Sequence, residues 1–335
     1  MSVLGFWKEL PRPFYVLAPM EDVTDTVFRR LVAECGRPHV FFSEFTSVDG
    51  LLSPAADRIS HRLHYLPEER PIVAQIWGND PEKFHQTAVE LRTRGFDGID
   101  INMGCPVEKI VKGGCCSALI EDPQLAAEIF LATKEGAGDI PVSIKTRIGF
   151  RRKITEEWAE CLLHLEPAVI TVHGRIAKQL SKGLADWGEI SKFAVKRDEM
   201  GKQTLIVGNG DVQNLEDADV RAANAGVDGV MIGRGIFDNL FLFNRHAVPL
   251  VERSVDEKLR LLLRHVEKFE GAWNGSKPFR ILKKFFKIYV QGFPGASQAR
   301  MRLVECETSD EVRNEVERIL SSQKVEIQSS ETHIG

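Results

Sequence analysis

The 335-residue chain lacks several features that mark other classes of protein. It contains no run of about 18 apolar residues, and its first residues lack the basic-then-apolar order of a secretory signal. We therefore expect a cytoplasmic protein that does not enter a membrane. The six cysteines form no CxxC pair and no histidines cluster with them, which argues against a disulfide framework and against structural zinc. Free thiols and no metal are expected.

The net charge of −4 conceals a basic segment. Residues 253–302 hold twelve Lys or Arg against four Asp or Glu, a net +8, so the remainder carries −12. A basic segment on an acidic body suggests a surface that docks a polyanion, although a solvated helical face would have the same composition. Charge alone does not separate these two interpretations.

Up to about residue 240, short β-branched runs alternate with helical stretches, a pattern typical of parallel βαβ units. Eight such runs occupy residues 14–20, 40–45, 71–77, 98–104, 141–147, 168–174, 204–210 and 229–235. Asp80-Pro81, Asp122-Pro123 and Asn214 supply N-cap signals for the helices between them. The GxGxxG turn of an open Rossmann sheet is missing. The pattern therefore predicts an α/β fold, a (β/α)8 TIM barrel.

The strand rhythm stops after residue 240, and amphipathic helical patterns take over. We predict a catalytic barrel over residues 1–242, a smaller all-α domain over residues 243–320 and a disordered tail over residues 321–335. The middle helix of the second domain should pack its aromatic and aliphatic residues inward. Its lysines, Lys283, Lys284 and Lys287, should face solvent.

In a TIM barrel, catalytic groups lie at the carboxyl ends of the strands. Nearly every predicted strand here ends in polar residues, so we expect the rim to hold a polar ligand. The glycines after the last two strands, with Arg234, are expected to bind a phosphate, because the loops after strands 7 and 8 are the usual phosphate site of this fold. Plain tight turns would also explain these glycines. The strand-end residues include Gln75, Asn102, Cys105, Lys145, Arg147, His173, Arg175, Asn209, Asp211 and Arg234.

Several of these residues have more than one chemical interpretation. Lys145 could form a Schiff base, as in aldolases, or act as a fixed cation beside an electron-rich ring such as a flavin. Cys105 could be a nucleophile, a general acid or a small buried residue. His173 is equally compatible with ligand binding and with a hydrogen-bonded place in the core.

Taken together, the motifs resemble those of the tRNA-dihydrouridine synthase family, flavin-dependent barrel enzymes that reduce uridines in tRNA. The matching segments stand in family order: APMEDVTD (18–25), AQIWG (74–78), DINMGCPV (100–107), SIKTRIG (143–149), TVHGR (171–175), ADW (185–187), GNGDV (208–212) and MIGRG (231–235). The basic helical segment is similar to the family's RNA-binding domain. The resemblance thus favours RNA docking for the +8 segment.

The resemblance also implies roles for individual residues. FMN would be held over its ring, at its edge and along its ribityl phosphate by Ala18, Pro19, Met20, Gln75, Lys145, His173, Asn209, Gly210, Asp211, Gly233 and Arg234. The RNA substrate would be contacted by Asn102, Arg147, Arg175, Lys283, Lys284 and Lys287. Cys105 would be the catalytic proton donor.

By the same resemblance, a hydride passes from N5 of reduced FMN to C6 of the uracil while Cys105 protonates C5, and NADPH or NADH reduces the flavin. The expected partner is tRNA, with rRNA as an alternative, and a monomer suits an enzyme that embraces a large RNA. A flavin barrel acting on a small free pyrimidine, as dihydroorotate dehydrogenases do, is the nearest rival. A catalytically dead RNA-binding barrel would bind no flavin.

The sequence departs from the family pattern at two places. Where many relatives have Gly and Ala after the catalytic cysteine, this chain has Gly113-Gly114-Cys115-Cys116. Either extra thiol could be a bystander or a redox partner of Cys105. Asp22 stands where glycine is common in the first motif.

Overall fold

The computed structural model describes residues 3–331, and it describes side chains as far as Ser322. The chain divides into two compact units. The first runs to Thr26 and resumes from Pro38 to Gly235, whereas the second takes Val27–Arg37 and the chain from Ile236 onward. The change thus falls at Gly235 rather than at residue 242, and the second unit also takes in most of the first helix. Within the described residues, no helix is long and apolar enough to cross a membrane.

The first unit is built on a ring of parallel strands. These are β1 (Phe14–Leu17), β2 (Phe41–Phe42), β4 (Ile72–Trp77), β5 (Gly98–Asn102), β6 (Val142–Arg147), β7 (Val169–His173), β8 (Leu205–Asn209) and β9 (Gly229–Ile232). Each of the eight predicted runs contains one of them, and the short β3 (Thr46–Ser47) pairs with β4 as well. The strand order is β1-β9-β8-β7-β6-β5-β4-β2, and a parallel bridge from Val16 to Val40 joins the two ends. The predicted (β/α)8 barrel is confirmed.

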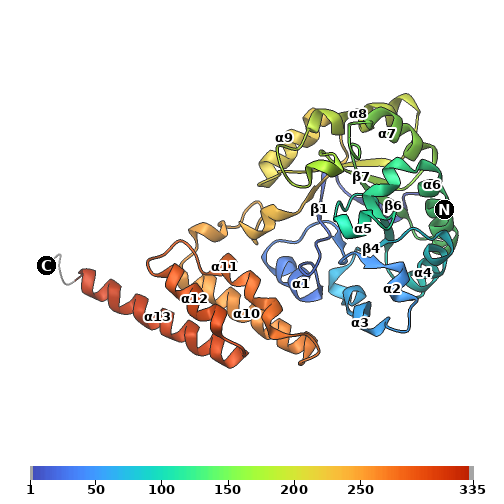
Figure 1. Ribbon diagram of the computed structural model, residues 1–335. Helices are drawn as coiled ribbons and strands as arrows, with labels where there is room; N and C mark the ends of the chain where they lie inside the picture. The colour runs from blue at the N-terminus through green and yellow to red at the C-terminus, as the bar shows by residue number, and fades with distance from the viewer. Residues whose placement is uncertain (1–2, 332–335) are drawn as a thin grey trace. The chain divides into compact units, whose positions relative to one another are not determined.

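Helices connect the strands and cover the outside of the ring (Figure 1). They are α4 (Pro81–Thr93), α6 (Pro123–Ala137), α7 (Thr155–His164), α8 (Trp187–Glu199) and α9 (Leu215–Ala225). The expected N-caps are present: Asp80, Asp122 and Asn214 each accept backbone N–H groups of the first helical turn. Gly226 ends α9 in the left-handed conformation, which a residue without Cβ adopts at no steric cost. Short elements fill the loops: α2 (Val48–Leu51), α3 (Asp57–Ser60) and α5 (Glu108–Val111).

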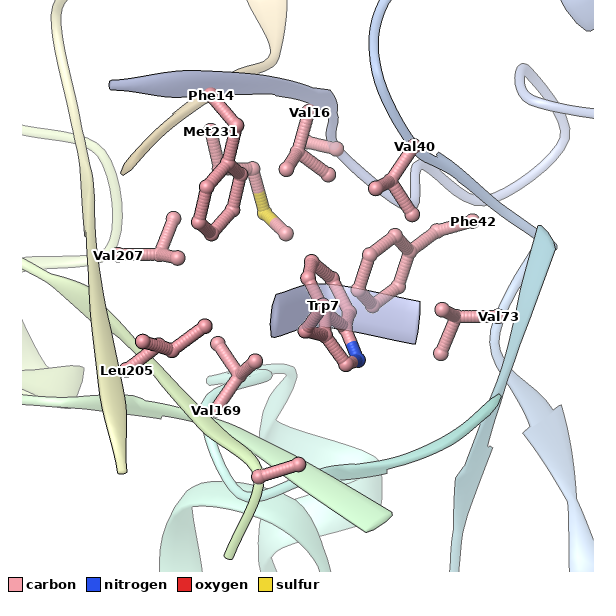
Figure 2. Packing of buried hydrophobic residues seen from close by; sticks show 12 residues of the cluster. Trp7, Phe14, Val16, Val40, Phe42, Val73, Val169, Leu205, Val207 and Met231 are labelled. Carbon is pink, nitrogen blue, oxygen red and sulfur yellow. The ribbon is translucent and has the colours of Figure 1, made fainter. Parts of the chain in front are cut away.

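The floor of the barrel is closed by the first helical turn of the chain, η1 (Gly5–Glu9). Its Trp7 is 1% exposed, and its ring lies 5.5 Å from that of Phe14 and 6.4 Å from that of Phe42. Figure 2 shows Trp7 among inward side chains from β1, β2, β4, β7, β8 and β9, including Val73 and Val169. No pattern in the sequence indicated this role. The lower half of the barrel is therefore a dry apolar core.

The second unit is helical and carries the basic segment. Its elements are α1 (Thr26–Cys35, apart from its first residue), α10 (Val255–Trp273), the 3-10 helix η8 (Phe279–Phe285), α11 (Phe286–Tyr289), α12 (Ala296–Glu305) and α13 (Ser309–Glu331). A capping box starts α10, in which Ser254 and Glu257 exchange hydrogen bonds between side chain and backbone. Helix α12 was not expected. Helix α13 extends past residue 321, where the sequence predicts a disordered tail, and residues 332–335 of that tail lie outside the described residues.

The middle helix of this unit differs from the single amphipathic helix that we expected. It is a 3-10 helix followed by one α-helical turn, and Phe285, Phe286, Ile288, Tyr289 and Val290 are all buried. Lys284 and Lys287, which are neighbours of these residues in the chain, are exposed. The expected division into buried aromatic or aliphatic residues and exposed lysines is thus present at these positions, although the segment is not one α-helix.

We predict that Trp7→Ala destabilises the protein by about 3–5 kcal/mol, because it empties the floor of a closely packed core. Urea denaturation followed by circular dichroism measures this loss. The control is Leu131→Ala on α6, whose side chain is 55% exposed and should matter by less than about 0.5 kcal/mol. Equal effects of the two substitutions would contradict a plugging role for Trp7.

Candidate active site

The pairing register brings the predicted polar residues together at the carboxyl ends of the strands. Asn102 is the partner of Lys145, Arg147 of His173, and His173 in turn of Asn209. Because alternate residues of a barrel strand face inward, these side chains lie above the apolar floor. The barrel is thus polar at the carboxyl ends of its strands and apolar at the opposite end.

A buried amide chain supports the turn that carries Cys105. The Asn102 Nδ2 donates to Gln75 Oε1 at 3.0 Å, and Asn102 Oδ1 accepts the backbone N–H groups of Gly104 at 3.0 Å and Cys105 at 2.9 Å. The far end of the chain is Asp100, which accepts Gln75 Nε2 at 2.7 Å. Sequence reasoning missed Asp100, although an acid in the middle of the apolar run GIDI was a signal for a buried polar contact.

Lys145 presents its ammonium to an amide oxygen. Its Nζ donates to Asn209 Oδ1 at 3.3 Å, and Asn209 Nδ2 donates to the Met231 carbonyl at 2.8 Å. Removal from water, and then repulsion by Arg147, lowers the pKa of Lys145 to about 8. Among the side chains that the structure describes, no acid lies within ion-pair distance of this ammonium. Such a group suits an anionic or electron-rich ligand.

His173 is held neutral in the same mouth. Burial and the positive charges of Lys145 and Arg147 lower its pKa to about 2. The Nη1 of Arg175 lies 3.1 Å from His173 Nε2. Because a guanidinium can only donate, Nε2 accepts and the ring proton is on Nδ1. His173 is thereby set as a neutral hydrogen-bond donor.

Arg175 and Asp211 form a partly buried ion pair beside His173. The Nη2 of Arg175 is 2.8 Å and 2.6 Å from the two Asp211 carboxylate oxygens, and Arg175 is 2% exposed. Asp211 Oδ2 also accepts the Ala185 N–H at 2.7 Å. Although burial opposes it, the hydrogen bond from Arg175 lowers the pKa of Asp211. The pair ties the loop after β7 to the loop after β8.

Arg147, like Arg175, links two loops of the barrel mouth through its guanidinium. Its Nε donates to the Gly104 carbonyl at 2.7 Å, and its Nη1 donates to the Ile176 and Leu180 carbonyls at 3.2 Å and 2.9 Å. The guanidinium thus joins the cysteine turn to the loop after β7. Both arginines that we expected to contact RNA have these hydrogen bonds within the protein.

The glycines after β8 and β9 adjoin the first motif. A Cβ on Gly210, whose φ is +134°, would lie 2.5 Å from that of Ala185, whereas one on Gly233 would lie 3.5 Å from the Ala18 Cβ and 3.8 Å from the Met20 sulfur. Pro19 stands between Ala18 and Met20 and is partly buried. Arg234 is largely exposed, with Nη2 3.5 Å from Asp211. The segment that we expect to cover the FMN ring, Ala18-Pro19-Met20, therefore adjoins Gly233, which we expect near the FMN phosphate.

Cys105 is partly exposed and in contact with a second thiol. Cys116 hydrogen-bonds the Cys105 thiol, and this bond lowers the Cys105 pKa to about 7 against the opposing effect of burial. The Ser117 N–H also donates to the Cys105 carbonyl at 3.3 Å. Cys116 is fully buried, with a φ of +56° that favours glycine. Of the two extra thiols, Cys116 is the one next to Cys105.

The three lysines of the helical unit do not have equal environments. Lys284 and Lys287 are exposed, as expected, whereas Lys283 is only 16% exposed and pairs with Glu307. Other cations of the basic segment are paired too: Arg264 and Lys268 both contact Glu34. Part of the +8 charge is therefore neutralised inside the unit.

Comparison with known proteins tests the family resemblance that the sequence motifs suggest. The dihydrouridine synthase (Dus) family profile matches residues 16–324. The chain belongs to this family. It is 44% identical over 314 residues to a probable tRNA-dihydrouridine synthase 2 of Bacillus subtilis, covering 92% of this chain and 94% of the relative. A probable tRNA-dihydrouridine synthase of Staphylococcus aureus (strain COL) is also 44% identical, with the same coverage.

Membership of the dihydrouridine synthase family makes the chain an enzyme, and the profile spans both units. Among solved structures, a 2-naphthoyl-CoA reductase in complex with 2-naphthoyl-CoA superposes with a TM-score of 0.53 at 10% identity, covering 69% of this chain and 49% of the reductase. At that identity the likeness shows the barrel fold alone.

We predict that Cys116→Ala raises the pKa of Cys105 from about 7 toward the ordinary thiol value, because the substitution removes the hydrogen bond that stabilises the thiolate. The measurement is the pH dependence of Cys105 alkylation by iodoacetamide, read by peptide mass spectrometry. Cys115→Ala is the matched control, since the Cys115 thiol contacts the Gly113 carbonyl instead. If the pH midpoint of Cys105 alkylation moves equally in both variants, or in neither, the hydrogen bond from Cys116 to the Cys105 thiol would be contradicted.

Proposed function

We propose that this dihydrouridine synthase reduces a uridine of tRNA to 5,6-dihydrouridine, with bound FMN that is itself reduced by NADPH or NADH. The observation that carries the proposal is a partly exposed thiol with a lowered pKa, Cys105, on the rim of a barrel mouth that also holds Lys145 and neutral His173. The names of the bacterial relatives support tRNA as the substrate.

The residues of the mouth fit a flavin mononucleotide. A cation held by an amide rather than by a carboxylate suits the electron-rich edge of the ring, which Lys145 would meet together with His173. Gln75 is 0% exposed and would act indirectly, by holding Asn102 in place. The segment Ala18-Pro19-Met20 would cover the ring. The ribityl phosphate would be held by Asn209, Gly210, Gly233 and Arg234, where close backbone approach and an exposed guanidinium suit an anion.

Asp211 has a different role in this proposal. A carboxylate repels a phosphate, and the Asp211 oxygens already accept from Arg175 and Ala185. Asp211 would therefore act on the cofactor indirectly, by fixing the loops after β7 and β8 and by balancing the charge of Arg175.

When bound, reduced FMN would supply the hydride for C6 of the uracil.

Cys105 would supply the proton for C5. With a pKa of about 7, its thiol is a stronger acid than an ordinary cysteine and yet substantially protonated at neutral pH, the range in which general acids are most effective. The thiolate left behind is stabilised by the Cys116 hydrogen bond and the Arg147 charge. Asn102 would orient this acid through its hydrogen bond from the Cys105 N–H.

The exposed lysines of the helical unit would contribute by neutralising RNA phosphates. Extracting a base from folded RNA costs a few kcal/mol, and phosphate contacts can offset this cost. A barrel that reduced a free pyrimidine would not need this unit. Retention of full turnover on a free pyrimidine after deletion of residues 245–335 would favour that rival, whereas an rRNA reductase would leave tRNA unmodified.

The test of the proposed function is the formation of dihydrouridine. Purified protein, FMN and NADPH are incubated with tRNA or rRNA from cells that lack the modification, and nucleosides are measured by mass spectrometry. We expect dihydrouridine in the tRNA. A protein that binds no FMN, or that leaves both RNAs unchanged, would overturn the proposal.

We predict that Cys105→Ala keeps FMN binding and NADPH oxidation but lowers dihydrouridine formation by about 10²- to 10⁴-fold, because only the protonation step loses its acid. Single-turnover assays with reduced enzyme measure the RNA step directly. Cys115→Ala, as the matched thiol control, should stay within about twofold. A normal yield from Cys105→Ala would refute the assignment of the acid.

We predict that Lys284→Glu and Lys287→Glu weaken RNA binding and reduce the salt slope of log Kd by about one for every phosphate that the variant no longer neutralises. Lys283→Glu should have a smaller effect on that slope, because its side chain is only 16% exposed whereas those of Lys284 and Lys287 are exposed. Filter binding across a salt series tests both statements. Unchanged slopes in the Lys284 and Lys287 variants would identify this face as merely solvated.

A further inference from the structure

Asp100 has an unusual place for a carboxylate. It lies inside the barrel on β5, is 0% exposed, and accepts hydrogen bonds from Ser143 Oγ at 2.6 Å and Gln75 Nε2 at 2.7 Å. Burial raises its pKa to about 6, so the group is still mainly ionised at neutral pH. No step of the proposed reaction uses Asp100 directly.

The polarity of the chain that starts at Asp100 is fixed from both ends. An ionised carboxylate can only accept, so Gln75 must turn its nitrogen toward Asp100 and its oxygen toward Asn102. At the other end, the backbone N–H groups of Gly104 and Cys105 can only donate, so Asn102 must turn its oxygen toward them. The Gln75–Asn102 hydrogen bond is consistent only with these two amide orientations.

Burial makes this polarity matter. Gln75 is 0% exposed and Asn102 is 5% exposed, so water cannot replace a lost partner in the chain. A reversed amide would place two donors or two acceptors face to face in the core, which proteins avoid. The orientation of the Asn102 amide is therefore held from two sides, by the N–H groups of its own turn and by a carboxylate two side chains away.

We propose that Asp100 is a positioning residue of the active site, which orients the Cys105 turn through Gln75 and Asn102. The inference rests on the proposed function for the role of Cys105 as the acid, whereas the orientation itself rests on the hydrogen bonds. Ser143 holds the other oxygen of Asp100 and takes no part in the amide chain.

A purely structural role for Asp100 would change the stability of the barrel alone. A positioning role also changes the reactivity of Cys105, whose thiol faces Cys116 and is influenced by the charges of Arg147 and Glu21. The two roles are therefore separated by a readout at Cys105 that does not need RNA turnover.

The experiment compares Asp100→Asn with Asp100→Leu. The asparagine keeps an oxygen for Gln75 and can turn its nitrogen toward Ser143 Oγ, so the chain keeps its polarity. The leucine has a similar size but no acceptor, which releases the Gln75 amide. Both variants lose the negative charge near Lys145, so charge effects on the flavin are common to both. Ser143→Ala is the control that removes the neighbouring hydrogen bond only.

We expect Asp100→Leu to lower kcat for dihydrouridine formation by about tenfold to 100-fold, with KM for tRNA unchanged within about twofold. In the same variant the alkylation midpoint of Cys105 should rise from about 7. Asp100→Asn should keep the pH midpoint of Cys105 alkylation at its native value and should keep most of the kcat that Asp100→Leu loses. Ser143→Ala should resemble the native enzyme.

A normal kcat and midpoint in Asp100→Leu would overturn the proposal, as would an Asp100→Asn variant that behaves like Asp100→Leu. If the leucine variant does not fold, Asp100→Ser replaces it, because the shorter hydroxyl cannot reach Gln75 in the same way. Native enzyme that forms no dihydrouridine would refute the proposed function, while the Cys105 midpoints would still test the orientation chain.

Discussion

The structure depends on one constraint, the closed ring of parallel strand pairing in the barrel. The register of that ring puts inward side chains from neighbouring strands at the same height, so apolar residues such as Val73 and Val169 share the floor while Asn102, Lys145 and His173 share the mouth. A slip of one residue in any pair would exchange inward and outward side chains. The chemistry at the mouth is thus a consequence of strand register before it is a property of any loop.

Electrostatics at the mouth follow from this arrangement. Lys145, Arg147 and Arg175 lie together with few carboxylates, and their summed positive charge helps to keep His173 neutral, while the charge of Arg147 contributes to the acidity of Cys105. The two arginines have a mechanical function as well, because each joins loops that follow different strands. The positive charge of the mouth and the rigidity of the loops around it therefore come from the same side chains.

Much of this could be predicted from sequence, because it depends on local chemistry. The eight β-branched runs and the caps at Asp80, Asp122 and Asn214 identified the barrel, and the strand-end rule selected the residues of the mouth. Contacts between distant segments could not be predicted in this way. Three such contacts depend on three-dimensional proximity: the hydrogen bond between the Cys116 and Cys105 thiols, the pairing of Lys283 with Glu307, and the hydrogen-bond chain from Asp100 to Cys105.

The plug formed by Trp7 has a consequence for how the protein is made. The ribosome releases Trp7 long before two of its neighbours in the core, Leu205 and Met231, which come from strands near the end of the barrel sequence. Strand β1 likewise cannot complete its strand pairing until β9 has been synthesised. Until more than 200 residues have emerged, the nascent chain must keep an aromatic residue and unpaired strand edges away from other chains. Chaperone demand during translation should therefore be set by the position of the last barrel strand in the sequence.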